Sequence, residues 1–199
     1  MNRHQKRSEE TRARLLEAAE RSFAQQGFDA TGVATICQVA GVTKGAFYHH
    51  FSSKQDVFME LLRRWLEGLD LQMTRLREDT ASIPEELLSM TSLIQEVLQT
   101  TEDHFPIYLE FWTRAMRDPT IRQELINPFY QYKDLFSEMV SNGISEGTLK
   151  DVPPEITARL ILAVALGLLI QALIDQHRDD WGQVTQECLQ ILLKGIAEN

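Results

Sequence analysis

The sequence predicts an all-α protein of about nine helices, arranged as a small N-terminal head and a larger C-terminal helical domain. Leu, Ile and Phe recur at helical spacing along most of the 199 residues. Only ten glycines and six prolines are present, and most of them lie at the ends of these periodic segments. The 43% apolar content is typical of a globular protein with a sizeable core. We place the head at residues 8–68 and the C-terminal domain at residues 69–199.

The first helix is expected to begin at Ser8 and to end at Gly27. Ser8 is a good N-cap, and the carboxylates of Glu9 and Glu10 suit the positive end of a helix dipole. Gly27 favours the left-handed conformation that ends many helices. Residues 1–7 are expected to form a short basic arm that is mobile in the free protein.

Two short helices joined by a tight turn are predicted next. An apolar stripe within residues 33–40 forms the first of them, and Gly41 ends it. Thr43 is a good N-cap for the second helix. Phe47 and Phe51 of that helix lie four residues apart and are expected to face inward.

The outer side of the second short helix has the composition of a surface that contacts DNA. Small residues such as Gly45 and Ala46 allow a helix backbone to approach base edges, and polar side chains around them can reach phosphates. A helix-turn-helix unit at about residues 31–50 is therefore predicted to bind a DNA groove. The candidate DNA contacts are Thr31, Thr43, Lys44, Gly45, Ala46, Tyr48, His49, His50 and Lys54.

The first third of the chain resembles the TetR/AcrR family of bacterial transcriptional repressors. The resemblance covers the segments ETRARLLEAAERSFAQQGF, TGVATICQVAGV, TKGAFYHHF and SKQDVF, in this order and at matching spacing. It implies a homodimer that binds operator DNA and is released from it by a small ligand. Gly32 stands where a second threonine is common, at the cost of one phosphate hydrogen bond, and the pair His49 and His50 is also less typical.

The charge distribution supports a nucleic-acid face at one end of the chain, although the net charge is −9. Residues 1–54 contain eight Lys or Arg and five acidic residues, so their net charge is +3. The remaining 145 residues therefore carry −12. Such asymmetry is typical of a chain with one DNA-binding end, and the acidic remainder would repel DNA and so orient the molecule.

A long helix is predicted from Lys54 to about Glu78, with Ser52 or Ser53 as its cap. A cation in the first turn of a helix is electrostatically unfavourable, and a phosphate bound there would explain Lys54. An ordinary exposed lysine is the alternative. Because a continuous helix is stiff, we expect this one to carry a ligand signal to the DNA-binding face.

Three further helices are predicted between residues 82 and 146. The first opens with a capping box at Ser82 and extends to about residue 100. The second begins at Pro106, and the third begins with the pair Asp118-Pro119. Gly143 and Gly147 are expected to loosen the end of the third helix.

The last two helices are predicted to pair two copies of the chain. The first of them is apolar on nearly all sides from Leu160 to Ile174, so it must be covered on all sides. This run is shorter than the ~20 residues that a membrane span needs. Asp180 caps the final helix, which carries one apolar stripe. A two-fold axis would build a four-helix interface from these helices, and a core within one chain is the alternative. The candidate interface residues are Leu160, Val164, Leu168, Trp181, Val184, Cys188, Ile191 and Ile196.

Aromatic residues in the middle of the chain indicate a largely apolar ligand pocket between helices. Phe111 and Phe136 are expected to be core residues instead. Arg114 and Arg117 could serve an anionic head group or lie on the surface. The candidate ligand contacts are Trp65, Tyr108, Trp112, Phe129, Tyr132 and Gln171.

Sequence signals for catalysis and for metal binding are absent. The chain has no phosphate-binding glycine loop, no nucleophile-elbow serine and no evident zinc-site spacing. We therefore predict no enzymatic activity, no cofactor and no metal. Cys37 and Cys188 are expected to be reduced, buried thiols of a cytoplasmic protein, with a disulfide as the alternative.

The predicted function is that of a homodimeric, sequence-specific DNA-binding regulator, a repressor released by a hydrophobic or aromatic small molecule. Its partners would be double-stranded operator DNA, a second copy of the chain and this ligand, with no membrane. One alternative is an activator or a regulator without a ligand. Another is a helical small-molecule carrier or enzyme whose N-terminal unit mediates protein contacts.

Overall fold

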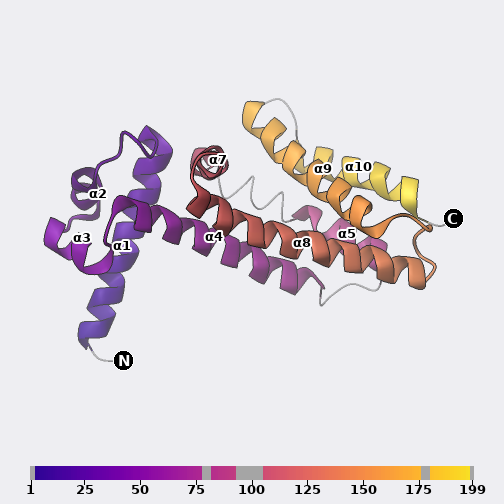
Figure 1. Ribbon diagram of the computed structural model, residues 1–199, viewed down its shortest axis with the longest axis horizontal. Coiled ribbons are helices and arrows are strands. Elements are labelled where there is room, and N and C mark those ends of the chain that lie inside the picture. The colour runs from indigo at the N-terminus through magenta and orange to yellow at the C-terminus, as the bar shows by residue number, and fades with distance from the viewer. Residues whose placement is uncertain (1–2, 78–81, 93–104, 176–179, 198–199) are drawn as a thin grey trace. The chain divides into compact units, whose positions relative to one another are not determined.

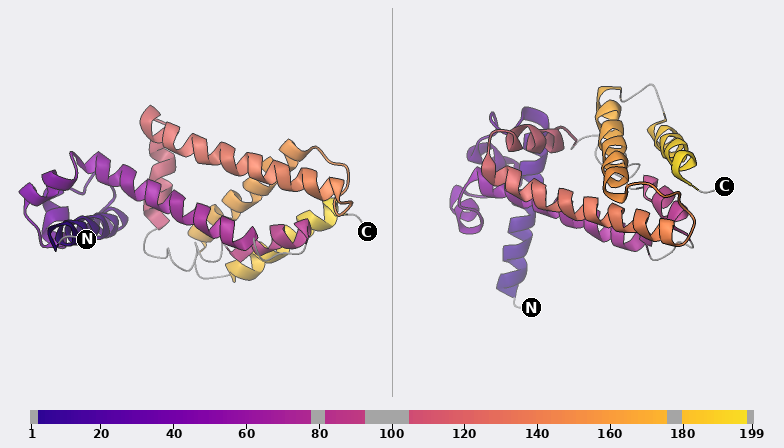
Figure 2. Two further views of the ribbon diagram at one scale, coloured as in Figure 1. Left: turned by 90° about the horizontal axis from the view of Figure 1, so that it is seen from below. Right: turned by 45° about the vertical axis from the view of Figure 1, so that its right-hand side comes forward.

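The computed structural model describes residues 3–77, 82–92, 105–175 and 180–197, and its regular structure within these ranges is entirely helical (Figures 1 and 2). The prediction of an all-α chain is confirmed. Nine helices lie in the described ranges: α1 (Arg3–Gln26), α2 (Val33–Ala40), α3 (Lys44–His50), α4 (Lys54–Arg77), α5 (Ile83–Ser89), α7 (Phe105–Ala115), α8 (Pro119–Ser145), α9 (Pro154–Ile174) and α10 (Trp181–Ile196).

The chain forms two compact units that are not contiguous in sequence. The first unit contains residues 1–67 and 102–124, and the second contains residues 68–101 and 125–199. Both α4 and α8 begin in the first unit and end in the second. The predicted boundary at residue 68 lies close to the first change of unit, but α7 belongs with the N-terminal head rather than with the C-terminal residues. The functional domain boundaries stay a prediction.

Several predicted helix ends are present because the capping side chains make the expected bonds. Gly41 has φ 64°, and the Thr43 hydroxyl accepts a hydrogen bond from the Ala46 amide at 3.2 Å. The Asp118 carboxylate accepts from the Thr120 amide at 2.8 Å, and Asp180 caps α10 through the Gly182 and Gln183 amides. Ser82 likewise accepts from the Glu85 amide at 3.4 Å, so α5 begins where the sequence predicts.

The first helix begins earlier than predicted. Ser8 lies inside α1, which starts at Arg3, and the Thr11 hydroxyl donates to the Arg7 carbonyl one turn before it. No glycine or proline interrupts this segment, so favourable helix propensity extends the helix past a residue that could have capped it. Gly27, with φ 79°, ends α1 as predicted.

The last turn of α8 is packed more tightly than predicted. Gly143 is buried, and a methyl group in place of its hydrogen would lie 2.7 Å from Leu149 Cδ1. The expectation that Gly143 loosens the helix is therefore wrong, because Leu149 and Ile83 occupy the space that a side chain would need. The predicted extension of the fifth helix to residue 100 passes beyond Ser89, where α5 ends, and its last part lies outside the described residues.

Each unit has its own apolar core. In the first unit, the Phe58 ring lies 4.6 Å from Phe28 and 4.2 Å from Phe111, and it meets Phe23 edge-on. In the second unit, buried residues of α4, α5, α8, α9 and α10 form one cluster that includes Met139, Val140 and Ile161. Phe111 and Phe136 are buried core residues, as predicted.

The α9 helix is long and apolar enough over Pro154–Ala172 to cross a membrane, by length and composition alone, and it is the one such helix in the described part of the chain. This apolar stretch begins before Leu160, the start of the apolar run predicted from the sequence. Its Ala158, Ile161 and Ala172 are buried in the second unit, as expected for a helix that packs against a protein core.

Candidate nucleic-acid interface and ligand cavity

The α2 and α3 helices form a compact corner whose inner side is apolar. The Val42 amide donates to the Cys37 carbonyl at 3.0 Å, which closes the turn after Gly41. Ile36 and Phe47 are fully buried, and Phe51 packs beside Phe47 with ring centroids 6.0 Å apart. The corner therefore holds α3 by one face and leaves its opposite face uncovered within the first unit.

The uncovered face of α3 carries most of the predicted DNA contacts. Thr43, Lys44, Gly45 and His49 are exposed, and Tyr48 is 58% exposed beside the buried Phe47. A Cβ on Gly45 would meet only the Thr43 hydroxyl, at 3.8 Å, so the fold itself does not require glycine there. These side chains are available to a duplex, and their DNA contacts stay a prediction.

The two histidines at the end of α3 differ in their surroundings. His49 is exposed, whereas His50 and Ala46 are half-buried. Burial, and then the nearby charges of His49 and Arg12, lower the pKa of His50. His50 therefore favours the uncharged form in the protein without DNA.

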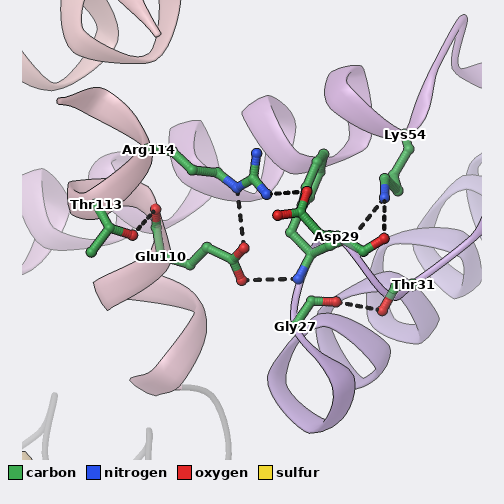
Figure 3. Close-up of polar contacts among 8 residues, drawn as sticks. Gly27, Asp29, Thr31, Lys54, Glu110, Thr113 and Arg114 are labelled. Atoms are coloured by element: carbon green, nitrogen blue, oxygen red, sulfur yellow. Dashed lines mark hydrogen bonds and ion pairs between the residues drawn. The ribbon is translucent and has the colours of Figure 1, made fainter. Parts of the chain in front are cut away.

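Thr31 does not lie on the DNA-facing surface, and its prediction as a DNA contact is wrong. Its side chain is fully buried, and its hydroxyl lies 2.8 Å from the Gly27 carbonyl and 3.1 Å from the Ser22 carbonyl. The hydroxyl proton is used inside the first unit, where it ties the α1–α2 loop to the end of α1 (Figure 3).

Lys54 is neither an ordinary exposed lysine nor fully available to a phosphate. Its ammonium group donates to the Phe28 carbonyl at 2.6 Å and lies 4.2 Å from the centre of the Phe28 ring (Figure 3). Burial is the main reason that the pKa of Lys54 is lowered, and the neighbouring Arg114 adds to this effect. The carbonyl explains the cation in the first turn of α4, and a phosphate contact by Lys54 stays a prediction.

Glu110 and Arg114 of α7 hold the same loop from the other side, as Figure 3 shows. The Glu110 carboxylate accepts from the Phe28 amide at 2.9 Å and from the Arg114 side chain at 3.1 Å. Arg114 also pairs with Asp29 at 2.5 Å, and its guanidinium lies 4.1 Å from the Phe28 ring centre. We call Glu110, Arg114 and Lys54, with the loop residues Phe28 and Asp29, the loop clamp.

The loop clamp pairs both backbone polar groups of Phe28, because its amide donates to Glu110 and its carbonyl accepts from Lys54. The cationic groups of Lys54 and Arg114 also lie 4.2 Å and 4.1 Å from the centre of the Phe28 ring. Burial alone would lower the pKa of Arg114, but its hydrogen bonds to Asp29 and Glu110 outweigh burial and raise it. Arg114 therefore stays charged inside the first unit. It is not available to a ligand head group, as one interpretation of the sequence allowed.

Replacing Glu110 by alanine is expected to destabilise the first unit by about 1–3 kcal/mol, because the buried Phe28 amide loses its acceptor. Hydrogen exchange of the Phe28 amide should accelerate in the full-length variant, and denaturant unfolding should give the free energy. Glu124→Ala is the control, since the 3.7 Å pair of Glu124 with Arg63 is exposed and worth at most about 1 kcal/mol. Unchanged exchange at Phe28 in Glu110→Ala would contradict the assignment.

A second ion-pair cluster connects α1 with α4. Arg12 contacts Glu60 at 2.6 Å and lies 5.2 Å from the Phe51 ring centre, at the end of α3. Burial would raise the pKa of Glu60, but the hydrogen bond and charge of Arg12, together with Arg64, bring it below its ordinary value. Through Arg12 and Glu60, which are both partly buried, this cluster connects α1 and α4 with Phe51, the residue that follows α3.

The second unit contains an apolar cavity of about 160 Å³. Its lining includes Leu69 and Met73 of α4, Leu87 of α5, Tyr132 and Phe136 of α8, and Leu168 of α9. None of the lining residues in the described ranges carries a charge. A concave site with an apolar lining and a few polar groups is the usual form of a small-molecule site.

Of the predicted ligand contacts, Tyr132 lines this cavity, and its contact with a ligand stays a prediction. Trp65 borders a surface hollow beside Leu16 in the first unit, and Trp112 is exposed there. Phe129 is not among the lining residues, and Gln171 is exposed and donates to the Gly167 carbonyl. The prediction that these four residues contact a ligand in this cavity is therefore not supported by their positions. Residue type alone does not indicate which face of a helix turns inward. The Tyr108 side chain lies outside the described residues.

The predicted interface residues divide between core and surface. Leu168 is buried in the second unit and lines the cavity, so its prediction as an interface residue is wrong. Val164 also lines the cavity, and Ile196 packs against the core cluster. Trp181 is half-buried and donates to the Asp175 carbonyl, and Val184 and Cys188 are half-buried as well. Leu160 and Ile191 remain largely exposed.

Within the described ranges, no group of three His, Cys, Asp or Glu side chains is placed to hold a metal ion. The His49 and His50 rings lie edge to face at 5.0 Å. Both cysteines are free, with Cys37 buried and Cys188 half-buried. Cys37 therefore matches the expected buried thiol, and Cys188 is more accessible than predicted.

Two family descriptions match most of the chain. Residues 15–61 match the family described as bacterial regulatory proteins, tetR family, and residues 84–195 match the C-terminal domain of BetI-type transcriptional repressors. An HTH-type transcriptional regulator of Bacillus subtilis is 27% identical over 94% of this chain and 91% of its own length. The HTH-type transcriptional repressor KstR2 of Mycobacterium tuberculosis is 29% identical over 75% of each chain.

Solved structures of regulators have the same fold. The ketosteroid transcriptional regulator KstR2 of Mycobacterium tuberculosis superposes with a TM-score of 0.74 and 27% identity, covering 94% of this chain and 95% of that one. A transcriptional regulator from Saccharomonospora viridis, solved in complex with choline, superposes with a TM-score of 0.84 at 23% identity. That pair covers 96% of this chain and all of the other.

Proposed function

Because the chain belongs to the TetR family of bacterial transcriptional regulators, we propose that it is a homodimeric repressor that a small apolar ligand releases from its operator. The observation that carries the proposal is the exposed outer face of α3, on which Lys44, Gly45 and Tyr48 lie. The buried Phe47 anchors the inner face of the same helix. Such a regulator acts in the cytoplasm, where the DNA is.

The exposed face of α3 has the properties that readout of a major groove needs. The small residues Gly45 and Ala46 permit close approach to base edges, and Lys44 can donate to them. Tyr48 and the exposed His49 can bind phosphates beside the groove. A symmetric dimer would place two such helices ~34–36 Å apart, or a multiple of this distance, on a roughly palindromic site.

Apolar side chains that remain exposed on the last two helices support a dimer. Leu160, Ile170 and Ile174 of α9 and Ile191 of α10 are large, apolar and about half exposed or more in the single chain. Isologous pairing of such surfaces is the most common way to build a soluble dimer. An interface of this kind also explains how α9 reaches the composition of a membrane span.

Regulation is proposed to run through α4. This helix is continuous from Lys54, which belongs to the loop clamp, to the turn that contributes Leu69 and Met73 to the cavity. A ligand in the cavity changes DNA affinity only if its free energy of binding differs between the DNA-binding and the released conformations. A regulator of this fold was solved in complex with choline, and another is named a ketosteroid transcriptional regulator, so relatives of this fold are associated with chemically different small molecules.

The DNA contacts are tested by titrating the full-length protein with the DNA upstream of its own reading frame. Tyr48→Phe is expected to weaken binding to all duplexes and to reduce the salt dependence of the affinity, because a phosphate contact is lost. Lys44→Ala should instead reduce the preference for the operator over random DNA, typically by a factor equivalent to about 1–3 kcal/mol.

Two outcomes would contradict these roles. Unchanged operator affinity in both variants would remove α3 as the reading helix. Equal weakening on operator and random DNA by Lys44→Ala would assign Lys44 to a phosphate. A promoter–reporter fusion separates repression from activation, since both would use the same contacts.

A further inference from the structure

The cavity of the second unit has few polar groups in its described lining, and these groups differ in whether their hydroxyl protons are already used in hydrogen bonds. Three of its lining residues carry a hydroxyl group: Thr91, Tyr132 and Thr185. The Thr91 hydroxyl donates to the Leu88 carbonyl at 2.7 Å, and the Thr185 hydroxyl donates to the Trp181 carbonyl at 2.7 Å. Both threonine protons are therefore used within their own helices or turns.

Tyr132 differs from the two threonines because its hydroxyl makes no hydrogen bond within the described part of the chain. The side chain is half-buried and packs against the core cluster. Burial, and to a lesser extent the negative charge of Asp70, raise the pKa of Tyr132 to about 12. The phenol consequently keeps its proton at physiological pH and can donate it to an acceptor on a molecule in the cavity.

We propose that the cavity binds a compact, uncharged molecule whose apolar body fills the space and whose single acceptor, such as a carbonyl oxygen, receives the Tyr132 hydrogen bond. This inference rests on the proposed ligand-responsive function and specifies the chemical class of the ligand. A ligand that displaces water from this hydroxyl without accepting its hydrogen bond leaves a donor unpaired at a cost, so the acceptor gives selectivity as well as affinity.

The volume of the cavity limits the size of the ligand. An engineered apolar cavity of roughly 150 Å³ in another protein stays dry and binds benzene. The cavity here has about 160 Å³ and a similar lining of aliphatic, methionine and aromatic side chains. A single ring with a short substituent therefore fits it without rearrangement of the helices.

No charged side chain is among the lining residues in the described part of the chain, so the proposed class consists of uncharged ligands. Among the described lining residues, a carboxylate would meet no cation and a quaternary ammonium would meet no carboxylate. The Asp70 side chain is exposed and is not one of them. Moving an ion from water into such surroundings costs far more than one hydrogen bond returns.

The test compares four compounds of similar size by calorimetric titration of the full-length protein. Acetophenone carries a carbonyl acceptor, ethylbenzene carries none, and benzoate and benzyltrimethylammonium carry opposite charges. We expect acetophenone to bind about tenfold more tightly than ethylbenzene, and neither ion to bind at concentrations at which acetophenone saturates. Binding of either ion as tight as that of acetophenone, or no binding of acetophenone, would overturn the inference.

Two matched variants locate the effect at Tyr132. Tyr132→Phe should lower the affinity for acetophenone about tenfold and leave that for ethylbenzene nearly unchanged, because only the hydroxyl is removed. Tyr130→Phe, the same substitution two residues away on an exposed side chain that does not line the cavity, should change neither affinity. Equal losses for both compounds in Tyr132→Phe would contradict the role of the hydroxyl.

Gel-shift titrations of the protein without ligand keep this inference separate from the proposed function. Operator binding with no selective uptake of acetophenone would overturn the ligand class and leave the regulator intact. Selective uptake without any operator binding would support the ligand class and overturn the regulator.

Discussion

Replacing Ile191 by glutamate is expected to convert the proposed dimer into a monomer and to lower operator affinity by at least about 100-fold, since a monomer engages only one half-site. Ile191 is 71% exposed on α10, although it is apolar and large. A carboxylate at this position would have to lose its hydration to enter an apolar interface. Sedimentation velocity measures the first effect, and fluorescence anisotropy with labelled operator DNA measures the second.

Met116→Glu is the control for this substitution. Met116 is 74% exposed, and it belongs to the first unit rather than to α9 or α10. It should leave both the oligomeric state and the operator affinity within about twofold of the parent protein, because surface substitutions rarely have large effects. A dimer that survives Ile191→Glu would show that the interface does not include this face of α10.

Replacing Phe58 by alanine is expected to destabilise the first unit by about 3–5 kcal/mol, the usual cost of removing a buried phenylalanine ring. Phe58 is fully buried and contacts the rings of Phe23, Phe28 and Phe111, so its loss leaves a void among three elements. Since domains are stable by only about 5–15 kcal/mol, this change removes a large fraction of the stability of the head.

Denaturant unfolding followed by tryptophan fluorescence measures this effect, because Trp65 and Trp112 both lie in the first unit. Phe129→Ala serves as the control, since its ring is only half-buried and its truncation should cost clearly less. If Phe58→Ala loses no more stability than Phe129→Ala, the four-ring cluster does not hold the head together.

The elements that the sequence predicted best are those whose ends depend on neighbouring residues. Gly41 and Thr43 define the corner between α2 and α3 through bonds that span three to five residues. The same is true of Asp118 and Asp180, which cap the helices that follow them. Such bonds form wherever the local sequence permits, so a reading of the chain in order finds them.

The ligand residues were predicted poorly because the lining of a cavity depends on packing between helices and not on neighbouring residues in the sequence. Trp65 and Trp112 are amphipathic, and both belong to helices with a buried side, but neither contributes to the cavity. The lining consists mainly of aliphatic residues such as Leu87 and Leu168, which look like ordinary core positions in a sequence. Among the predicted residues whose side chains are described, Tyr132 alone combined a recognisable side chain with a position in the cavity lining.

The sequence by itself determined the helical fold, the corner formed by α2 and α3, and the exposed residues of α3, because periodicity and capping are local properties. Tertiary structure decided the roles of Thr31, Lys54 and Glu110, whose partners are up to 82 residues away. It also decided which side of α9 is core. That helix is apolar all round, so only packing could separate buried Leu168 from exposed Leu160. The hydrophobic effect is non-directional, so the positions of the neighbouring helices determine which face of α9 is buried.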